Sequence, residues 1–302
     1  MLSEFDLIRK YFARPARNAV LGVGDDAALL RPAAGMELAV STDLLIEGRH
    51  FRAGADARKL GHKALAVNLS DMAAMGATPR WATLALALPT ADERWLAGFS
   101  KGFFALARRF GVELVGGDTT RGPLSICVTI LGEVPKKKAL RRDGARPADG
   151  IWVSGCLGGA AYAFARPGNA AAAKRLHTPE PRVALGLHLR GIASAAIDVS
   201  DGFAQDLGHI LERSGVGAAV HYERLPKYRI RDAKLERRCV LAGGDDYELV
   251  FTARAGARID AIARALKLRL TRVGSIGRRR GLQILDADGK RMNVGRGFDH
   301  FA

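Results

Sequence analysis

A charged, turn-rich segment divides the chain into two halves. Residues 136–150 read KKKALRRDGARPADG, which combines charge with Gly, Pro and Asp and is typical of a junction between domains. The chain has 302 residues, enough for two domains of ordinary size. We therefore predict an N-terminal domain over residues 1–137 and a C-terminal domain over residues 138–302.

Strand-like and helix-like segments occur in both halves, which predicts an α+β fold for each. Helices are predicted over residues 4–12, 58–75, 92–110 and 182–190. Strands are predicted over residues 38–42, 81–88, 112–115, 125–134, 151–154, 195–199 and 248–253.

The three cysteines and the N-terminal residues predict a cytoplasmic protein. Cys127, Cys156 and Cys239 match no zinc or redox spacing, and their odd number argues against a disulfide framework. The first residues mix charged and apolar side chains, without the apolar core of a signal peptide. The longest apolar stretches, such as residues 81–89, are too short to span a bilayer, so no membrane partner is expected.

The net charge of +16 is the main argument for nucleic acid as a partner. Much of this charge comes from arginines on predicted helix surfaces, such as Arg108 and Arg264, and no recognised DNA- or RNA-binding motif accompanies it. Charge alone indicates solubility and nonspecific binding, so no specific nucleic acid partner is expected.

Aspartates recur beside Gly, Ser or Thr in six short segments, at predicted ends of strands or helices. These segments are residues 24–27, 41–43, 68–71, 116–120, 198–202 and 243–247. Small neighbours allow a backbone to approach a ligand closely, and magnesium prefers oxygen ligands together with water and phosphate oxygens. Each segment alone is better explained as a turn or a helix cap, but the repetition of all six favours a site for several magnesium ions.

Asp71 is the most informative of these acids. On a helix it shares a stripe with Ala64, Asn68 and Met75, which predicts that its side chain points inward. A buried carboxylate is costly unless it is paired or bound to metal, so a metal site and an internal salt bridge are both open. His50 lies seven residues after Asp43, in a Gly-Arg-His-Phe segment, where a substrate contact and a structural role are equally compatible with the sequence.

Several common nucleotide-binding and catalytic motifs are absent from the sequence. There is no G-x-x-x-x-G-K-[ST] loop, no dinucleotide-binding glycine motif, no protein-kinase motif set and no G-x-S-x-G turn. If a nucleotide is bound, its phosphates do not lie in a standard glycine loop with a lysine.

In this order the motifs resemble those of the thiamine-monophosphate kinase family. They read GVGDD, STD, a later His, NLSDMAAMGA, GGDTT, DVSDG and GGDDYEL, and the resemblance covers essentially the whole chain. It implies a two-domain fold like that of aminoimidazole ribonucleotide synthetase, with mixed sheets covered by helices. It also implies a homodimer formed through the N-terminal domains, with magnesium as cofactor and ATP as co-substrate.

The resemblance also implies roles for individual residues. The positions that match magnesium ligands are Asp26, Ser41, Thr42, Asp43, Asp71, Asp118, Asp198 and Asp201. The positions that match ATP contacts are Gly117, Asp118, Arg142 and Ser200, and those that match thiamine monophosphate contacts are His50, Asp245 and Phe298. Asp71, Asp118 and Arg142 are the expected catalytic group, and Asp245 is a departure because the family commonly has Glu there.

The expected reaction is in-line transfer of the ATP γ-phosphoryl group to thiamine monophosphate, which gives thiamine diphosphate and ADP. A phosphate monoester is largely dianionic near neutral pH, so the acceptor needs no strong general base. Two alternatives remain open. One is another ATP-dependent enzyme of the superfamily, acting on a purine intermediate or selenide, and the other is a basic nucleic-acid-binding protein.

Overall fold

The computed structural model describes residues 3–294 and 297, and the chain folds into two compact units. The first unit comprises Met1–Met72 and Ala77–Lys137, and the second comprises Ala73–Gly76 and Lys138–Ala302. None of the helices formed by the described residues combines the length and apolar character that a membrane span requires.

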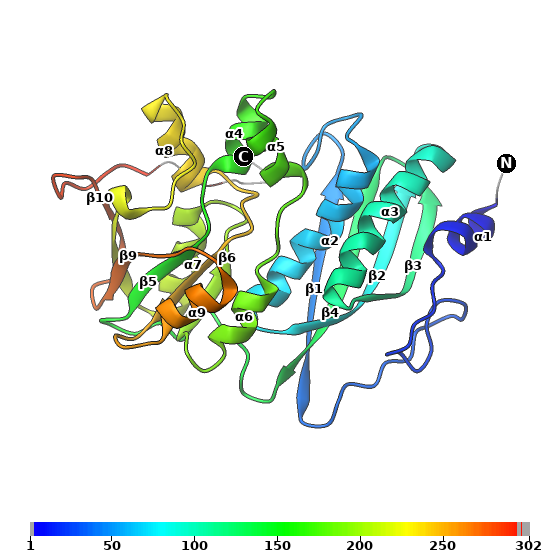
Figure 1. Ribbon diagram of the computed structural model, residues 1–302, viewed down its shortest axis with the longest axis horizontal. Coiled ribbons are helices and arrows are strands. Elements are labelled where there is room, and N and C mark those ends of the chain that lie inside the picture. Colours follow the sequence, from blue (N-terminus) through cyan, green and yellow to red (C-terminus); the bar gives the residue numbers. More distant parts are fainter. Residues whose placement is uncertain (1–2, 295–296, 298–302) are drawn as a thin grey trace. The chain divides into compact units, whose positions relative to one another are not determined.

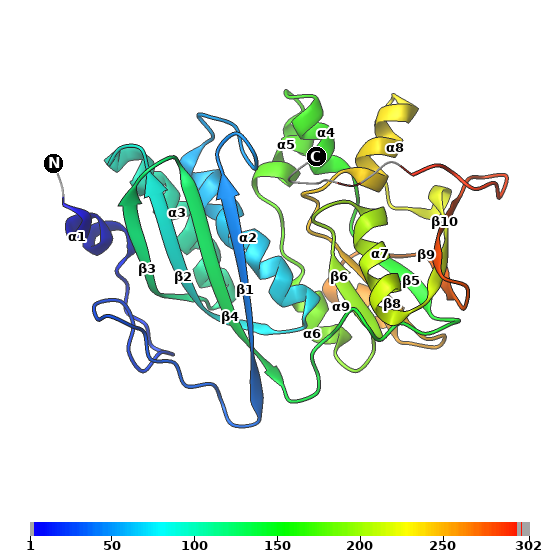
Figure 2. The same cartoon turned by 180° about the vertical axis from the view of Figure 1, so that it is seen from behind.

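The first unit is a mixed sheet with helices on one face (Figures 1 and 2). Its described elements are α1 (Glu4–Leu7), η1 (Ile8–Phe12), β1 (Met36–Ile46), α2 (Ala57–Ala74), β2 (Thr78–Leu88), α3 (Glu93–Phe110), β3 (Glu113–Arg121) and β4 (Ser125–Pro135). The strand order is β1-β4-β2-β3, so β1 and β3 are the two edges of the sheet. β4 is antiparallel to both of its neighbours, whereas β2 and β3 are parallel.

No helix formed by the described residues covers the other face of this sheet (Figure 2). Ser41 and Leu45 of β1 point to the helical face, so the alternate positions point away from it. Four alternate positions on the open face are large and apolar, and their exposed fractions are 41% for Leu38, 57% for Val40, 48% for Leu44 and 38% for Ile46.

The second unit is also a mixed sheet, with helices on both faces (Figures 1 and 2). Its described strands are β5 (Gly150–Ser154), β6 (Ala195–Asp198), β7 (Gly217–His221), β8 (Leu249–Ala253), β9 (Leu270–Gly277) and β10 (Gly281–Leu285), in the order β10-β7-β9-β5-β8-β6. Its described helices are α4 (Gly159–Ala165), α5 (Ala170–His177), α6 (Val183–Leu189), α7 (Phe203–Ser214), η2 (Tyr222–Arg224), α8 (Ala233–Ala242) and α9 (Ile259–Leu266). Phe203, Leu207 and Ile210 of α7 pack with β5 and β8 in its core.

These two units confirm the predicted α+β class with mixed sheets covered by helices. Two local predictions are wrong. The helix predicted over residues 4–12 divides into α1 and the π-helical turn η1, whose Tyr11 hydroxyl donates to Glu93 Oε2 at 2.9 Å. Asp43 and Asp118 lie within β1 and β3 and not at their ends, because both strands extend beyond the predicted limits.

Two glycines allow α2 and α3 to pack closely over the sheet. A Cβ atom at Gly61 would lie 2.1 Å from the carbonyl oxygen of Phe99, and a Cβ atom at Gly102 would lie 1.8 Å from that of Arg58. Glycine lowers helix stability by about 1 kcal/mol relative to alanine, so both positions favour close approach over helix propensity.

We predict that Gly102→Ala destabilises the protein by about 1–3 kcal/mol, because the added methyl group must separate the two helices. Gly208→Ala in α7 is the matched control, since a Cβ atom there has nothing within 4 Å. The control should gain about 0.5–1 kcal/mol from helix propensity. Urea unfolding measures both effects, and equal stability changes in the two variants would contradict the steric argument.

Candidate active site

The edge strand β1 and helix α2 hold the first group of predicted ligands. The Ser41 hydroxyl of β1 donates to Asp71 Oδ2 of α2 at 2.5 Å. Asp43 is two residues from Ser41 on the same strand, so its side chain points to the same face. The structure therefore brings Ser41 and Asp71 into contact at the β1 edge of the sheet, with Asp43 on the same face of β1.

Asp71 points toward the sheet, as its position on the predicted helical stripe requires. Ala64 and Asn68 of that stripe are fully buried, and Asn68 Nδ2 donates to the carbonyl oxygen of Ala64 at 3.0 Å. Met75 is 37% exposed, so the prediction that it continues the buried stripe is wrong. The reason is that α2 ends at Ala74, one residue before it.

Thr42 is separated from this group by the alternation of the strand. Its hydroxyl lies 2.8 Å from that of Thr129 on β4, on the open face of the sheet. Its side chain therefore does not lie with those of Ser41 and Asp71.

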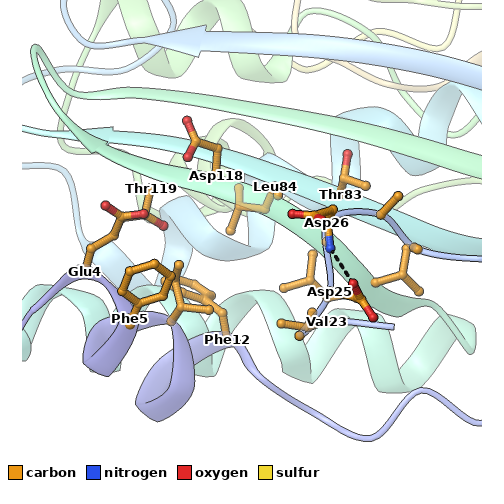
Figure 3. A pocket seen from close by; sticks show the side chains of 18 residues that line it. Glu4, Phe5, Phe12, Val23, Asp25, Asp26, Thr83, Leu84, Asp118 and Thr119 are labelled. Atoms are coloured by element: carbon orange, nitrogen blue, oxygen red, sulfur yellow. Dashed lines mark hydrogen bonds between the residues drawn. The ribbon is translucent and has the colours of Figure 1, made fainter. Parts of the chain in front are cut away.

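A pocket of ≈ 620 Å³ lies at the opposite edge of the sheet, along β3 (Figure 3). Its wall comes from the N-terminal helices, from the loop after them and from the strands β2 and β3; three predicted site residues line it, namely Asp26, Gly117 and Asp118. Figure 3 also shows Phe5 and Phe12 beside the acids, so the pocket is partly apolar. Its size and mixed lining are typical of a site for a small molecule.

At Gly117 the backbone of β3 approaches β2 too closely for a residue with a side chain. The φ of Gly117 is +148°, and a Cβ atom would lie 1.9 Å from the carbonyl oxygen of Leu84. The neighbouring loop is held by a hydrogen bond from the Asp26 amide to Asp25 Oδ1 at 3.0 Å.

In the second unit, Asp198 is the last residue of β6, and the loop after it carries Ser200 and Asp201. Its backbone is fixed by Asp206 of α7, whose Oδ2 accepts hydrogen bonds from the amides of Ser200, Asp201 and Gly202, each at 3.1 Å. Burial, followed by the negative charges of Asp198 and Asp201, raises the pKa of the Asp206 carboxyl to about 7. Sequence reasoning missed Asp206, although an acid in the first turn of a helix that follows an Asp-Gly pair is a detectable signal.

The loop that contains Asp245 packs directly on this first loop. The amide of Asp245 donates to the carbonyl oxygen of Ser200 at 2.9 Å, and that of Tyr247 donates to Val199 at 2.8 Å. Asp245 and Tyr247 have φ values of 67° and 50°, which is uncommon for residues with side chains. The Tyr247 hydroxyl donates to Asp245 Oδ1 at 2.8 Å and so fixes the direction of the carboxylate.

A buried ion pair supports the same end of the second unit, and sequence reasoning missed it as well. Arg182 donates to both carboxylate oxygens of Glu248 at 2.7 Å, and the Ser154 hydroxyl adds a third bond at 2.6 Å. The neighbouring Asp246 accepts hydrogen bonds from the amides of Gly158 at 2.6 Å and Ala160 at 3.4 Å. Burial raises the pKa of the Asp246 carboxyl to about 7, because its effect outweighs that of these two hydrogen bonds, which lower the pKa.

Arg142 lies beside the strand that carries Asp198. The preceding carbonyl oxygen, of Arg141, accepts the amide of Ala196 in β6 at 3.0 Å, and the Arg142 carbonyl oxygen accepts the Ser214 hydroxyl at 2.9 Å. The Arg142 side chain itself is exposed.

His50 is oriented by its own turn. Its Nδ1 accepts the amide of Ile46 at 3.0 Å, so the neutral ring carries its proton on Nε2. That N–H is the donor with which His50 can meet an anionic ligand. Phe298, the third predicted substrate contact, lies outside the described residues.

The predicted ligands offer only oxygen donors, which suits a hard cation. Within the described part of the chain, no three or more His, Cys, Asp or Glu side chains form a group that could hold a metal ion. The Ser41 and Asp71 oxygens are 2.5 Å apart, slightly less than the roughly 2.9 Å between adjacent ligands of an octahedral ion with bonds of about 2.0–2.1 Å. A small opening at this contact would therefore accommodate such an ion, with water and phosphate oxygens as its other ligands.

Known proteins resemble this chain over its whole length. The family model "AIR synthase related protein, N-terminal domain" matches residues 24–134. The thiamine-monophosphate kinase of Salmonella typhimurium is 44% identical over 99% of this chain and 98% of its own. The crystal structure of the Stenotrophomonas maltophilia thiamine-monophosphate kinase is 48% identical, covers 96% of this chain and 98% of its own, and has a TM-score of 0.87. The structure of AaThiL complexed with AMPPCP and TMP is 29% identical, with a TM-score of 0.76 and coverage of 98% and 96%.

The buried Asp246 predicts a pH-dependent stability. Its pKa is about 7 in the folded protein and near 3.8 in an unfolded chain, so its stabilising contribution is present below pH 3.8 and is lost as the pH rises to 7. Asp246→Asn removes this loss, so the variant should gain stability relative to wild type between pH 5 and pH 8, by up to about 1.4 kcal/mol per pH unit. Urea unfolding at both pH values measures the difference, with the exposed Asp288→Asn as control. If the free energies of unfolding of Asp246→Asn and wild type differed by the same amount at pH 5 and pH 8, the prediction would be wrong.

Proposed function

Because the chain belongs to the thiamine-monophosphate kinase family, we propose that it transfers the γ-phosphoryl group of ATP to thiamine monophosphate, giving thiamine diphosphate and ADP. The observation that carries this proposal is the full-length similarity to named thiamine-monophosphate kinases, together with a structural relative complexed with AMPPCP and TMP. The geometry agrees with it, since Asp26 and Asp118, which offer only oxygen donors, line a pocket large enough for a small molecule.

In this proposal the chain positions two anions and neutralises their charge. An oxygen of the thiamine monophosphate phosphate attacks the γ-phosphorus in line, and the bond from that phosphorus to the β–γ bridging oxygen breaks as ADP leaves. When bound, magnesium ions would neutralise the phosphate oxygens and bring the two anions together. The residues that would hold these ions are Asp26, Ser41, Asp43, Asp71, Asp118, Asp198 and Asp201, with Thr42 able to contribute only through its backbone.

Other residues would bind the two substrates. Gly117 and Ser200 would contact ATP, and the exposed Arg142 guanidinium is a two-pronged donor for its phosphates. His50 would donate its Nε2 proton to the phosphate of thiamine monophosphate. Asp245 would contact the same substrate. Its left-handed backbone and the hydrogen bond from the Tyr247 hydroxyl fix the direction of its carboxylate, which reaches one bond less far than that of the usual Glu.

The proposal includes a cytoplasmic setting, which the three free cysteines support. It also includes a homodimer formed through the first unit, which the uncovered apolar face of the sheet supports. A face with four large, exposed apolar side chains on one strand is more apolar than a monomer commonly leaves in water.

The central test is ADP formation with magnesium, ATP and thiamine monophosphate. We predict that Asp71→Asn lowers kcat by at least about 100-fold and raises the magnesium concentration required for activity, because a ligand oxygen is lost. Asp56→Asn is the matched control, since Asp56 caps α2 through the Lys59 amide and asparagine caps equally well. Near-normal turnover by Asp71→Asn would remove the metal role.

The same assay separates the alternatives. ADP released with a purine intermediate or selenide, and none with thiamine monophosphate, would assign the chain to another activity of the superfamily. Steep salt-dependent binding to nucleic acid without ATP turnover would favour the basic binding protein.

The dimer has its own test. We predict that Val40→Asp shifts the protein from dimer to monomer in size-exclusion chromatography with light scattering, because it places a charge in the middle of the apolar face. Val20→Asp is the control, since Val20 is 55% exposed but lies outside β1. A wild-type monomer at micromolar concentration, or a Val40→Asp dimer, would contradict the proposed interface.

A further inference from the structure

Lys63 of α2 is buried, which is unusual for a lysine. It is only 2% exposed, and the next residues of the helix, Ala64 and Leu65, belong to the core of the first unit. Moving an ammonium group out of water costs free energy unless other groups bind it. A methionine, which is also long and unbranched, would fill this position without that cost. The charge of Lys63 therefore needs an explanation other than packing.

The ammonium group of Lys63 contacts the turn that carries His50. Lys63 Nζ donates to the carbonyl oxygen of His50 at 3.4 Å. This is a long hydrogen bond, but the positive charge of the donor strengthens it, and the low exposure of Lys63 limits competition from water. The bond joins the turn after β1 to the second turn of α2.

The turn that carries His50 has a fixed internal shape. The amide of His50 donates to the carbonyl oxygen of Ile46 at 2.9 Å, and that of Gly48 donates to the carbonyl oxygen of Phe51 at 2.8 Å. The imidazole belongs to the same unit, because its Nδ1 accepts the Ile46 amide at 3.0 Å. The direction of the ring is therefore coupled to the backbone of the turn, and a displacement of the turn displaces the ring.

Contacts outside the turn determine where this unit lies. The Glu47 amide donates to the carbonyl oxygen of Leu124, just before β4, at 3.2 Å, and the side chain of Phe51 is buried. The bond from Lys63 adds a contact with α2. It acts on the carbonyl group of His50 itself, so it is the contact closest to the imidazole.

Helix α2 also carries Asp71, an expected magnesium ligand. Asp71 follows Lys63 by eight residues, which corresponds to about 12 Å along the helix axis. The Ser41 hydroxyl donates to Asp71 at 2.5 Å, so α2 contacts β1 near the middle of the strand and the His50 turn beyond its end. These two contacts set the distance between Asp71 and the imidazole of His50.

We propose that Lys63 is a positioning residue for the acceptor substrate, which holds the His50 turn against α2. This rests on the proposed function, which assigns the His50 Nε2 proton to the phosphate of thiamine monophosphate and Asp71 to magnesium. The effect of Lys63 passes through the backbone of His50 and requires no contact with a substrate. A misplacement of about 1 Å can lower the rate of an enzyme 100-fold, so a fixed distance between His50 and Asp71 matters for transfer between two anions.

Lys63→Met tests this role, since it removes the charge and the donor but keeps a long apolar side chain. We expect the KM for thiamine monophosphate to rise at least about tenfold, while the KM for ATP stays within about twofold of wild type. The thermal unfolding midpoint should be equal to that of wild type or higher, because the cost of burying a charge is removed. Lys59→Met is the matched control, since Lys59 lies one turn earlier on α2 and is exposed, and it should behave as wild type.

A double-mutant cycle with His50→Ala separates positioning from a general effect. If Lys63 acts through His50, then Lys63→Met should add less than about a twofold change once the imidazole is absent. Effects that multiply in the double variant, or a folded Lys63→Met with a wild-type KM for thiamine monophosphate, would overturn the proposal. Loss of folding in Lys63→Met would also overturn it, because the lysine would then be structural. A wild-type KM for thiamine monophosphate in His50→Ala would instead contradict the role of His50 in the proposed function.

Discussion

The pairing of β4 between β1 and β2 determines where the chemistry of the first unit can occur. β4 pairs with β1 over the whole length of both strands, from Met36 opposite Pro135 to Ile46 opposite Ser125. This pairing moves β1 to one edge of the sheet and leaves β3 at the other. Because side chains alternate along a strand, Ser41 and Asp43 turn toward α2, while Thr42 turns to the open face. One hydrogen-bonding pattern thus fixes both the position and the direction of each acid.

In the second unit, two loops position the predicted site residues, and one of these loops supports the other. A single carboxylate, that of Asp206, accepts three amides of the loop after β6, and the Asp245 loop then bonds to the carbonyl oxygens of that loop. Each left-handed residue in the Asp245 loop costs about 1–2 kcal/mol. The buried ion pair between Glu248 and Arg182, just before β8, holds this loop in its strained conformation, because a shift of the strand would leave a buried charge unpaired. The result is a rigid support for Ser200 and Asp245.

The sequence predicted what depends on local pattern and failed where distant residues meet. The helical stripe of Ala64, Asn68 and Asp71 predicted the inward direction of Asp71, because α2 packs on the sheet through that stripe. The lengths of β1 and β3 were underestimated because Asp43 and Asp118 interrupt the apolar alternation, although backbone pairing carries the strands past them. The bond between Arg182 and Glu248 joins residues 66 positions apart, and no local spacing encodes such a pairing. The strand order likewise joins segments that are distant in the sequence, and it places Asp43 of β1 and Asp118 of β3 at opposite edges of the sheet.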